Sequence, residues 1–370
     1  MTTPRIRVAI VFGGRSDEHA VSWMSARSVV AALDDQRFEP VGLLIDREGG
    51  WHRVPDLAGL LRAGPAADGS AGRIGPAVGG AAALAAPRDS ALTGQTPGLG
   101  LDRSFDLDVV FPLVHGPNGE DGTLQGLLEL CGLPYVGSGV LGSALGMDKI
   151  VQKDLLTRHG LPTVRYAAVQ RRDWRADRQG TLDAVLAAVG LPCYVKPAHL
   201  GSSVGIGRAT DRAELEAALD AAAGYGRRVV CEASVEDKRE IECAVLGNES
   251  PVVSVPGEVL PQRAFYDYEL KYQPGGAQLV VPAELSPAVA ESVRNLALRA
   301  FALLDCAGLA RVDFFVERST DRVLLNEVNT IPGFTSTSMY PLLWEHSGLD
   351  YRSLITRLIE LALERHGADS

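Results

Sequence analysis

The stretch of residues 309–329, LARVDFFVERSTDRVLLNEVN, decides the fold of the second half of the chain. Two apolar runs, 309–316 and 323–329, flank a polar segment of the kind found in turns. Short β-branched and aromatic runs on both sides of such a turn are typical of a β-hairpin. We therefore predict two antiparallel strands here.

The polar residues of this hairpin are predicted to share one face. A turn centred on Thr320 places Asp313 opposite Glu327. The same register places Arg311 opposite Asn329, and side chains alternate along a strand, so all four residues face one way. Two carboxylates about 5 Å apart repel each other and need a cation or a shared proton. Such oxygen ligands suit Mg²⁺ supplemented by phosphate oxygens, whereas the alternative is a solvated face whose charges pair with Arg311.

The chain that follows the hairpin carries groups able to bind anions. Residues 330–338, TIPGFTSTS, supply the Gly333 N–H and several hydroxyls. These donors suit a carboxylate or a developing oxyanion. We therefore expect metal, phosphate and substrate to meet at the end of the second strand.

Two lysines precede or follow segments suited to phosphate binding. Lys196 ends a predicted strand just before the Gly/Ser-rich loop 201–207, and backbone N–H groups in such loops form anion-binding concavities. This arrangement suits ATP, although a bare Gly/Ser loop is more often an ordinary turn. The loop does not match GxxxxGK[ST], which disfavours a P-loop ATPase. Lys149 is a second candidate, and taken alone it is typical of a solvated helix residue.

The first half of the chain reads as repeated β-loop-α units, which imply a mainly parallel sheet with ligands near the strand ends. Glu18 lies at the first loop-helix junction, where it suits a substrate ammonium or simply the helix dipole. Residues 52–104 are rich in Gly, Ala and Pro, and we interpret them as an insertion or a mobile excursion. The predicted elements are strands 5–12, 41–45, 108–114, 193–196, 229–232, 241–246 and 252–255, and helices 21–33, 123–131, 149–159, 211–223, 286–304 and 351–364. We expect the last helix to serve as a lid or a docking element.

Composition limits the class of protein. A chain of 370 residues exceeds one hydrophobic core, so we predict subdomains 1–146, 147–235 and 236–370. The net charge of −10 argues against nucleic-acid or anionic-membrane partners. Five scattered cysteines without metal-site spacing indicate reduced thiols. Neither a signal peptide nor an apolar run long enough for a bilayer is present, so we expect no membrane insertion and a cytoplasmic location.

Taken together, the motifs closely resemble the D-alanine–D-alanine ligase family of the ATP-grasp superfamily, from residue 8 to about residue 364. The stretches that carry the resemblance are 13–22, GGRSDEHAVS; 115–122, HGPNGEDG; and 326–338, NEVNTIPGFTSTS. The resemblance implies an α/β, three-domain ATP-grasp fold with an N-terminal parallel-sheet domain. It further implies ATP and two Mg²⁺, with Mn²⁺ possible in their place, D-alanine as the substrate, a homodimer, and a role in peptidoglycan precursor synthesis.

The resemblance also assigns roles to individual residues. It implies catalytic roles for Glu18, Ser202, Tyr272, Arg311, Gly333 and Ser338. It implies substrate binding by Glu18, His115, Lys271, Arg311, Gly333, Ser338 and Met339. It implies nucleotide binding by Lys149, Lys196, Ser202, Ser203, Glu232, Glu240, Lys271 and Asn326, and metal binding by Asp313, Glu327 and Asn329. In the family a serine, a tyrosine and the first-substrate glutamate, here Ser202, Tyr272 and Glu18, link a closing loop to the site.

The implied reaction has two steps. One D-alanine carboxylate attacks the γ-phosphate of ATP to give D-alanyl phosphate, and the amine of the second D-alanine then attacks this acyl group. The nearest alternative is a D-alanine–D-lactate ligase or another ATP-grasp ligase, and the Lys271-Tyr272 pair favours the dipeptide product. An alternative of another class is a nucleotide-binding regulatory or dinucleotide-dependent protein. The absence of GxGxxG followed by a ribose-binding acid argues against it.

Overall fold

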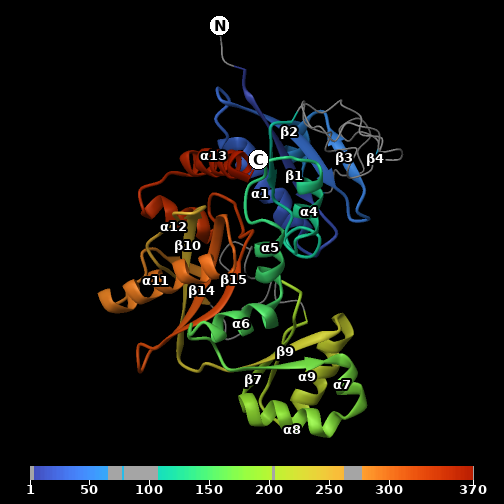
Figure 1. Cartoon of the computed structure of the whole chain (residues 1–370), viewed down its shortest axis with the longest axis vertical. Coiled ribbons are helices and arrows are strands. Elements are labelled where there is room, and N and C mark those ends of the chain that lie inside the picture. Colours follow the sequence, from blue (N-terminus) through green and yellow to red (C-terminus); the bar gives the residue numbers. More distant parts are fainter. Residues whose placement is uncertain (1–3, 66–76, 79–106, 202–204, 262–276, 370) are drawn as a thin grey trace.

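Three α/β units make up the chain, and they lie one after another along its long axis (Figure 1). The computed structural model describes residues 4–65, 77–78, 107–201, 205–261 and 277–369. Each unit is built on one sheet with helices packed against it. The mixed arrangement confirms the predicted α/β class.

The first unit holds a five-stranded sheet in the order β4-β3-β2-β1-β5. Strand β1 lies between β2 and β5 and is parallel to both, whereas β3 and β4 add antiparallel pairs at the other edge. Both faces of β1 are buried, which is expected of a parallel strand covered by helices on both sides. The elements are β1 Ile6–Gly13, α1 His19–Ala32, β2 Phe38–Ile45, β3 Trp51–Val54, α2 Leu57–Ala63, β4 Ala77–Val78, β5 Val109–Pro112 and α4 Thr123–Leu130.

Part of the predicted insertion belongs to this first unit. All of helix α2 and all but the first residue of strand β3 fall inside residues 52–104, and Leu60 and Leu61 of α2 are buried in the core. The prediction of an insertion was therefore wrong for the start of this stretch, because its leucines give it a buried face. Residues 79–104 lie beyond the part of the chain that the structure describes.

The second unit is a four-stranded antiparallel sheet in the order β6-β9-β7-β8. One face packs on helices, and Val195 and Cys231 contribute to that core. Alternation turns Lys196 and Glu232 to the opposite face. The elements are β6 Tyr166–Gln170, α7 Arg171–Ala176, α8 Arg178–Val189, β7 Cys193–Pro197, β8 Gly207–Ala209, α9 Arg212–Tyr225 and β9 Arg228–Ala233.

The third unit holds an antiparallel sheet in the order β13-β12-β10-β14-β15, with the short β11 paired to β10. Helix α11 covers one face through a core that contains Val293, Phe301 and Val312. The elements are β10 Lys238–Gly247, β11 Val252–Val253, β12 Gly257–Pro261, β13 Ala277–Val280, α11 Pro287–Leu303, β14 Gly308–Glu317, β15 Val323–Asn329 and α12 Met339–His346.

Three helices join the units. Helices α5 Val140–Met147 and α6 Lys149–Arg158 follow the first unit, and Leu156 of α6 is buried in the core of the third sheet. The last helix, α13 Tyr351–Asp369, buries Leu354 and Leu358 in a core shared with β1 and α1. This helix therefore docks the end of the chain onto the first unit (Figure 1). The exact subdomain bounds stay a prediction.

Candidate active site

The register of the β14–β15 hairpin is as predicted. Asp313 pairs with Glu327, and Arg311 pairs with Asn329. The ladder then shifts between Asp313 and Phe314, because Phe314 pairs with Leu325 and leaves Asn326 without a direct partner. The hairpin therefore contains a β-bulge immediately beyond the paired carboxylates.

The bulge aims the polar side chains away from the core. Before it, Val323 and Leu325 point into the core of the third unit; after it, Val328 does so. The positions that face this core thus switch from odd to even numbers at Asn326, which is the extra residue of the bulge. Glu327 is turned to the polar face as a result, since successive side chains of a strand alternate.

Arg311 neutralises the carboxylates of this face. Its Nε and Nη2 atoms donate to Asp313 Oδ1 and Oδ2, each at 2.7 Å. Nε also lies 3.0 Å from Glu242 Oε2. Asn329 Nδ2 donates to Asp313 Oδ2 at 3.0 Å. Glu242, which lies opposite Asp313 on β10, was not predicted as a site residue, because the β10–β14 pairing joins distant segments.

The donor set fits a hard divalent cation. Asp313, Glu327 and Asn329 offer carboxylate and amide oxygens on one face of adjacent strands. Within the described residues no three His, Cys, Asp or Glu side chains form a metal-binding group. Mg²⁺ commonly combines a few protein oxygens of this kind with phosphate oxygens or water.

Two lysines converge on Glu232. Lys196 Nζ lies 2.6 Å from Glu232 Oε2, and Lys153 Nζ lies 2.9 Å from Oε1. Burial opposes ionisation of this 3% exposed carboxyl group, but the two ammonium groups together lower the pKa of Glu232. Burial also disfavours the charge on Lys196, yet Glu232 and Glu327 raise the pKa of Lys196 above its ordinary value. Lys153 was not predicted as a site residue.

Lys149 connects the second unit to the hairpin. Its Nζ donates to the Leu200 carbonyl oxygen at 3.0 Å and lies 3.6 Å from Glu327 Oε2. Asp148 caps α6 by accepting from the Ile150 and Val151 N–H groups, which fixes where Lys149 begins the helix. The structure therefore places a predicted phosphate lysine beside a predicted metal ligand.

His115 lies between the first and third units and has an unused nitrogen. Its Nδ1 donates to the Ile331 carbonyl oxygen at 3.0 Å, while Nε2 has no hydrogen-bond partner among the described residues. The ring is 3% exposed. Burial lowers the pKa of His115, although Glu18 and the bond to Ile331 oppose the shift. A buried unsatisfied atom of this kind is consistent with a ligand site.

Two carboxylates, Glu18 and Glu120, belong to the same part of the site as His115. Glu18 is 9% exposed, and a Cβ built on either Gly116 or Gly201 would come within 3.4 Å of its Oε2 atom. Glu120 accepts from the Gly116 N–H at 2.6 Å. Burial and the charge of Glu18 raise the pKa of Glu120 to about 8. Glu120 belongs to the 115–122 stretch but was not predicted as a site residue.

The remaining predicted residues occupy two edges of the cluster. Gly333 lies in the loop between β15 and α12, and Ser338 precedes α12, where its Oγ accepts from the Thr335 N–H at 3.1 Å. Met339 is 6% exposed and its side chain packs in the hydrophobic core. Its backbone N–H, and not its side chain, is therefore the group to consider for substrate binding. Glu240 pairs with Lys238 at 3.1 Å.

Aromatic rings lie near Lys238 at this second edge. Its Nζ lies 3.6 Å from the ring centroid of Phe315 and 6.0 Å from that of Tyr194. Lys238 thus approaches rings from the third and second sheets together. Four predicted site residues, Ser202, Ser203, Lys271 and Tyr272, lie outside the described residues.

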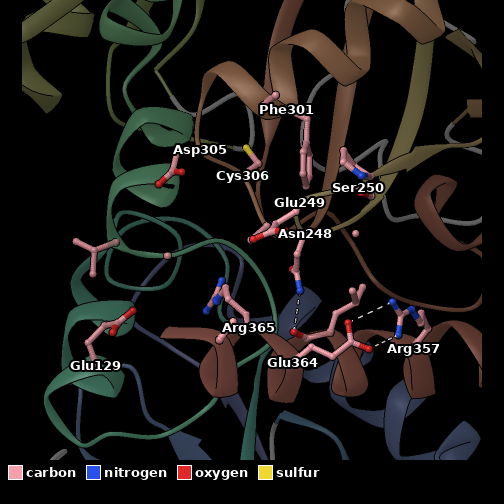
Figure 2. Close-up of a pocket in the computed structure, with 18 residues that line it drawn as sticks. Glu129, Asn248, Glu249, Ser250, Phe301, Asp305, Cys306, Arg357, Glu364 and Arg365 are labelled. Atoms are coloured by element: carbon pink, nitrogen blue, oxygen red, sulfur yellow. Dashed lines mark hydrogen bonds and ion pairs between the residues drawn. The ribbon is translucent and has the colours of Figure 1, made fainter. Parts of the chain in front are cut away.

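A cavity of about 890 Å³ lies apart from this cluster, between α13, the end of α11 and the start of α5 (Figure 2). Arg357 Nη1 donates to Glu364 Oε1 at 2.7 Å along its rim, and Asn248 Nδ2 donates to the Leu361 carbonyl oxygen at 3.0 Å. None of the predicted site residues lines it. The cavity is therefore separate from the candidate active site.

Comparison with known families matches both halves of the chain. The family described as D-ala D-ala ligase N-terminus matches residues 7–138, and the family described as D-ala D-ala ligase C-terminus matches residues 155–360. The chain is similar to a D-alanine–D-alanine ligase of Deinococcus radiodurans, at 48% identity over 97% of this chain and 98% of the relative. It is 44% identical to that of Geobacillus thermodenitrificans, over 98% and 96% of the two chains.

Solved structures give the same result. The D-alanine–D-alanine ligase from Coxiella burnetii matches with a TM-score of 0.85 and 36% identity, over 99% of this chain and 96% of that one. The VanG D-Ala:D-Ser ligase from Enterococcus faecalis matches with a TM-score of 0.80 and 30% identity, over 97% and 100% of the two chains. In the portion that the structure describes, no helix is both long and apolar enough to span a membrane.

Proposed function

The chain belongs to the D-alanine–D-alanine ligase family, and we propose that it joins two D-alanines with ATP at the polar cluster between its three units. Its fold is the ATP-grasp fold of that family. The reaction is an ATP-dependent ligation that forms D-alanyl-D-alanine for peptidoglycan precursors, with ADP and phosphate as the other products.

One observation carries the assignment of the site: Lys149 Nζ lies 3.6 Å from Glu327 Oε2. A lysine suits phosphate oxygens and a strand carboxylate suits Mg²⁺, so their proximity supports a site for a metal nucleotide at this point. Lys196 belongs to the same charged group, because Glu327 contributes to its raised pKa. The 890 Å³ cavity has no comparable arrangement of groups.

In the first step the Glu18 carboxylate holds the ammonium of one D-alanine, and His115 Nε2 is available to a second polar group of that substrate. A carboxylate oxygen of this D-alanine then forms a bond to the γ-phosphorus of ATP. The bond from that phosphorus to the oxygen of ADP breaks, which leaves D-alanyl phosphate. Lys149 and Lys196 hold the phosphate oxygens, and positioning supplies much of the acceleration.

Asp313, Glu327 and Asn329 would hold the two Mg²⁺, or Mn²⁺, that the family implies. When bound, these cations neutralise the phosphate charge that develops during transfer. In the structure Arg311 already provides positive charge to Asp313 through two bonds. Asp313 and Glu327 lie directly opposite each other, with Asn329 on the same strand as Glu327, and this pairing of oxygen ligands supports their use around a cation.

In the second step the amine of another D-alanine attacks the acyl carbon of D-alanyl phosphate. A carbon–nitrogen bond forms, the amine loses a proton, and the bond to phosphate breaks. Arg311 and the Gly333 N–H stabilise the oxyanion of the tetrahedral intermediate. Ser338, at the start of α12, holds the carboxylate of the second D-alanine together with the Met339 N–H.

A product assay tests this function. The purified chain is supplied with ATP and Mg²⁺ and with D-alanine alone, D-alanine with D-lactate or D-serine, or L-alanine. Phosphate release and product mass are then measured. Release with D-alanine alone and a D-alanyl-D-alanine product are expected, whereas no release in any mixture despite ATP binding would contradict the proposal. Addition of EDTA should abolish release, and Mg²⁺ or Mn²⁺ should restore it.

The second candidate is a ligase with another acceptor. The similarity to a D-Ala:D-Ser ligase favours its inclusion in the assay. Lys271 and Tyr272, on which the sequence-based choice of acceptor depends, lie outside the described residues. A mixed product formed in preference to the dipeptide would select this alternative.

We also propose that the ligase is a cytoplasmic homodimer. Leu130 at the end of α4 is 85% exposed and Leu141 of α5 is 56% exposed, which supports a contact between copies at this surface. All five cysteines are free and buried, as suits a reducing compartment. Sedimentation analysis of the chain and of a Leu141→Glu variant tests the dimer, because the variant should sediment as a monomer.

A further inference from the structure

Lys153 is a buried lysine to which the reaction described above assigns no role. It lies on α6, and only 2% of its side chain is exposed. Its Nζ lies 2.9 Å from Glu232 Oε1 and donates to the Asn326 carbonyl oxygen at 3.0 Å. Burial of an ammonium group is costly unless it is paired, so these two contacts hold Lys153 in one place.

The charges around Glu232 explain why a second lysine is needed. If Lys196 alone contacted Glu232, at 2.6 Å, the pair would be neutral overall. Lys153 adds a positive charge on the other carboxylate oxygen, so the group of three carries a net charge of +1. A net positive charge attracts phosphate oxygens, whereas a neutral pair does so weakly.

We propose that Lys153 is a positioning residue of the ligase: it neutralises Glu232, so that the Lys196 ammonium keeps its charge for the phosphates of ATP. This inference rests on the proposed function. Only 2% of the Lys153 side chain is exposed, whereas 13% of the Lys149 side chain is, so Lys149 is the more accessible of the two to a ligand.

The contact with Asn326 also lets Lys153 hold the strand that carries Glu327. Asn326 is the bulge residue that turns Glu327 to the polar face, and a bulge leaves its backbone groups without ladder partners. Lys153 satisfies the Asn326 carbonyl, and it contacts β9 of the second sheet through Glu232. One side chain therefore fixes the phosphate lysine relative to the metal-binding strand.

The experiment compares ATP with adenosine as ligands of the full chain. Dissociation constants are measured by calorimetry for the wild type, Lys153→Met, Glu232→Gln and the double variant. Lys153→Met should weaken ATP binding by about tenfold or more, while adenosine binding changes by less than about threefold, because only ATP carries phosphates. The double variant again carries a net charge of +1, since only Lys196 remains charged, so it should bind ATP within about threefold of the wild type.

The outcomes separate the inference from the proposed function. A wild-type chain that does not bind ATP would overturn both. ATP binding that is equal in the wild type and Lys153→Met would overturn the inference alone, and so would equal losses for ATP and adenosine. If Lys153→Met does not fold, the double variant, which lacks both buried charges and keeps the net charge of +1, is compared with the wild type. A loss of tenfold in that comparison would also overturn the inference.

Discussion

Asp313 and Glu327 lie directly opposite each other on β14 and β15, one residue before the ladder shifts at Asn326. In an unbroken strand, two residues on the same face are separated by an even number of positions. Leu325 and Val328 are three positions apart, and the shift is what allows both to pack in the same core. It thereby permits a buried hydrophobic face and a carboxylate pair on one short hairpin. The placement of Glu327 follows from this irregularity.

Glu327→Gln should lower turnover by at least about a hundredfold, because a neutral amide is a weaker ligand for the cation that neutralises the transferred phosphate. Phosphate release at saturating ATP and D-alanine measures the effect. Glu345→Gln, which changes an exposed carboxylate on α12, is the matched control and should retain activity. Wild-type turnover in Glu327→Gln would remove this residue from the metal site.

His115→Asn should raise the KM for D-alanine by about tenfold and leave ATP binding unchanged. Asparagine can keep a donor near the Ile331 carbonyl oxygen, but it has no atom in the place of Nε2, the nitrogen without a partner. Steady-state kinetics with varied D-alanine gives the KM. An unchanged value would mean that Nε2 does not contact the substrate.

Glu120→Gln should stabilise the substrate-free chain increasingly as the pH rises. The folded pKa of Glu120, about 8, lies above its ordinary value of 4.5. The folded state therefore binds more protons between these values, and wild-type stability falls as the pH rises through this window. The amide cannot ionise beside Glu18, so it avoids this loss.

Melting temperatures measured at about pH 6 and about pH 9 test the effect of Glu120. The advantage of Glu120→Gln over the wild type should grow by roughly 2 °C or more between them. Lys149 and Glu18 also act on this carboxyl group, so both are kept unchanged. A constant difference across the window would contradict the raised pKa.

Gln152→Met should lower the free energy of unfolding by about 2–4 kcal/mol, because it leaves both backbone groups of Val328 unpaired. Gln152 is 1% exposed; its Oε1 accepts from the Val328 N–H at 3.1 Å and its Nε2 donates to the Val328 carbonyl oxygen at 3.2 Å. Denaturant titration gives the free energy. The exposed Gln179→Met is the control and should change it by less than about 0.5 kcal/mol.

Local patterns were sufficient to predict the hairpin from the sequence. The alternation of residues 309–316 and 323–329 gave the strands, and the length of the turn gave the opposition of Asp313 and Glu327. Lys196 was found in the same way, because it ends an apolar strand before a Gly/Ser loop. These features depend on neighbours in the chain, which the sequence displays directly.

Only the tertiary structure brought Lys153, Glu242 and Glu120 into the site. Lys153 contacts Asn326, which lies 173 positions away in the chain, and Glu242 faces Asp313 across a pairing of separate strands. No local period encodes such contacts, because they arise when three sheets pack together. The sequence by itself thus determined which strands carry the reactive groups. Packing decided which buried charges surround those groups, since the cost of burying a charge is met only by partners that folding assembles.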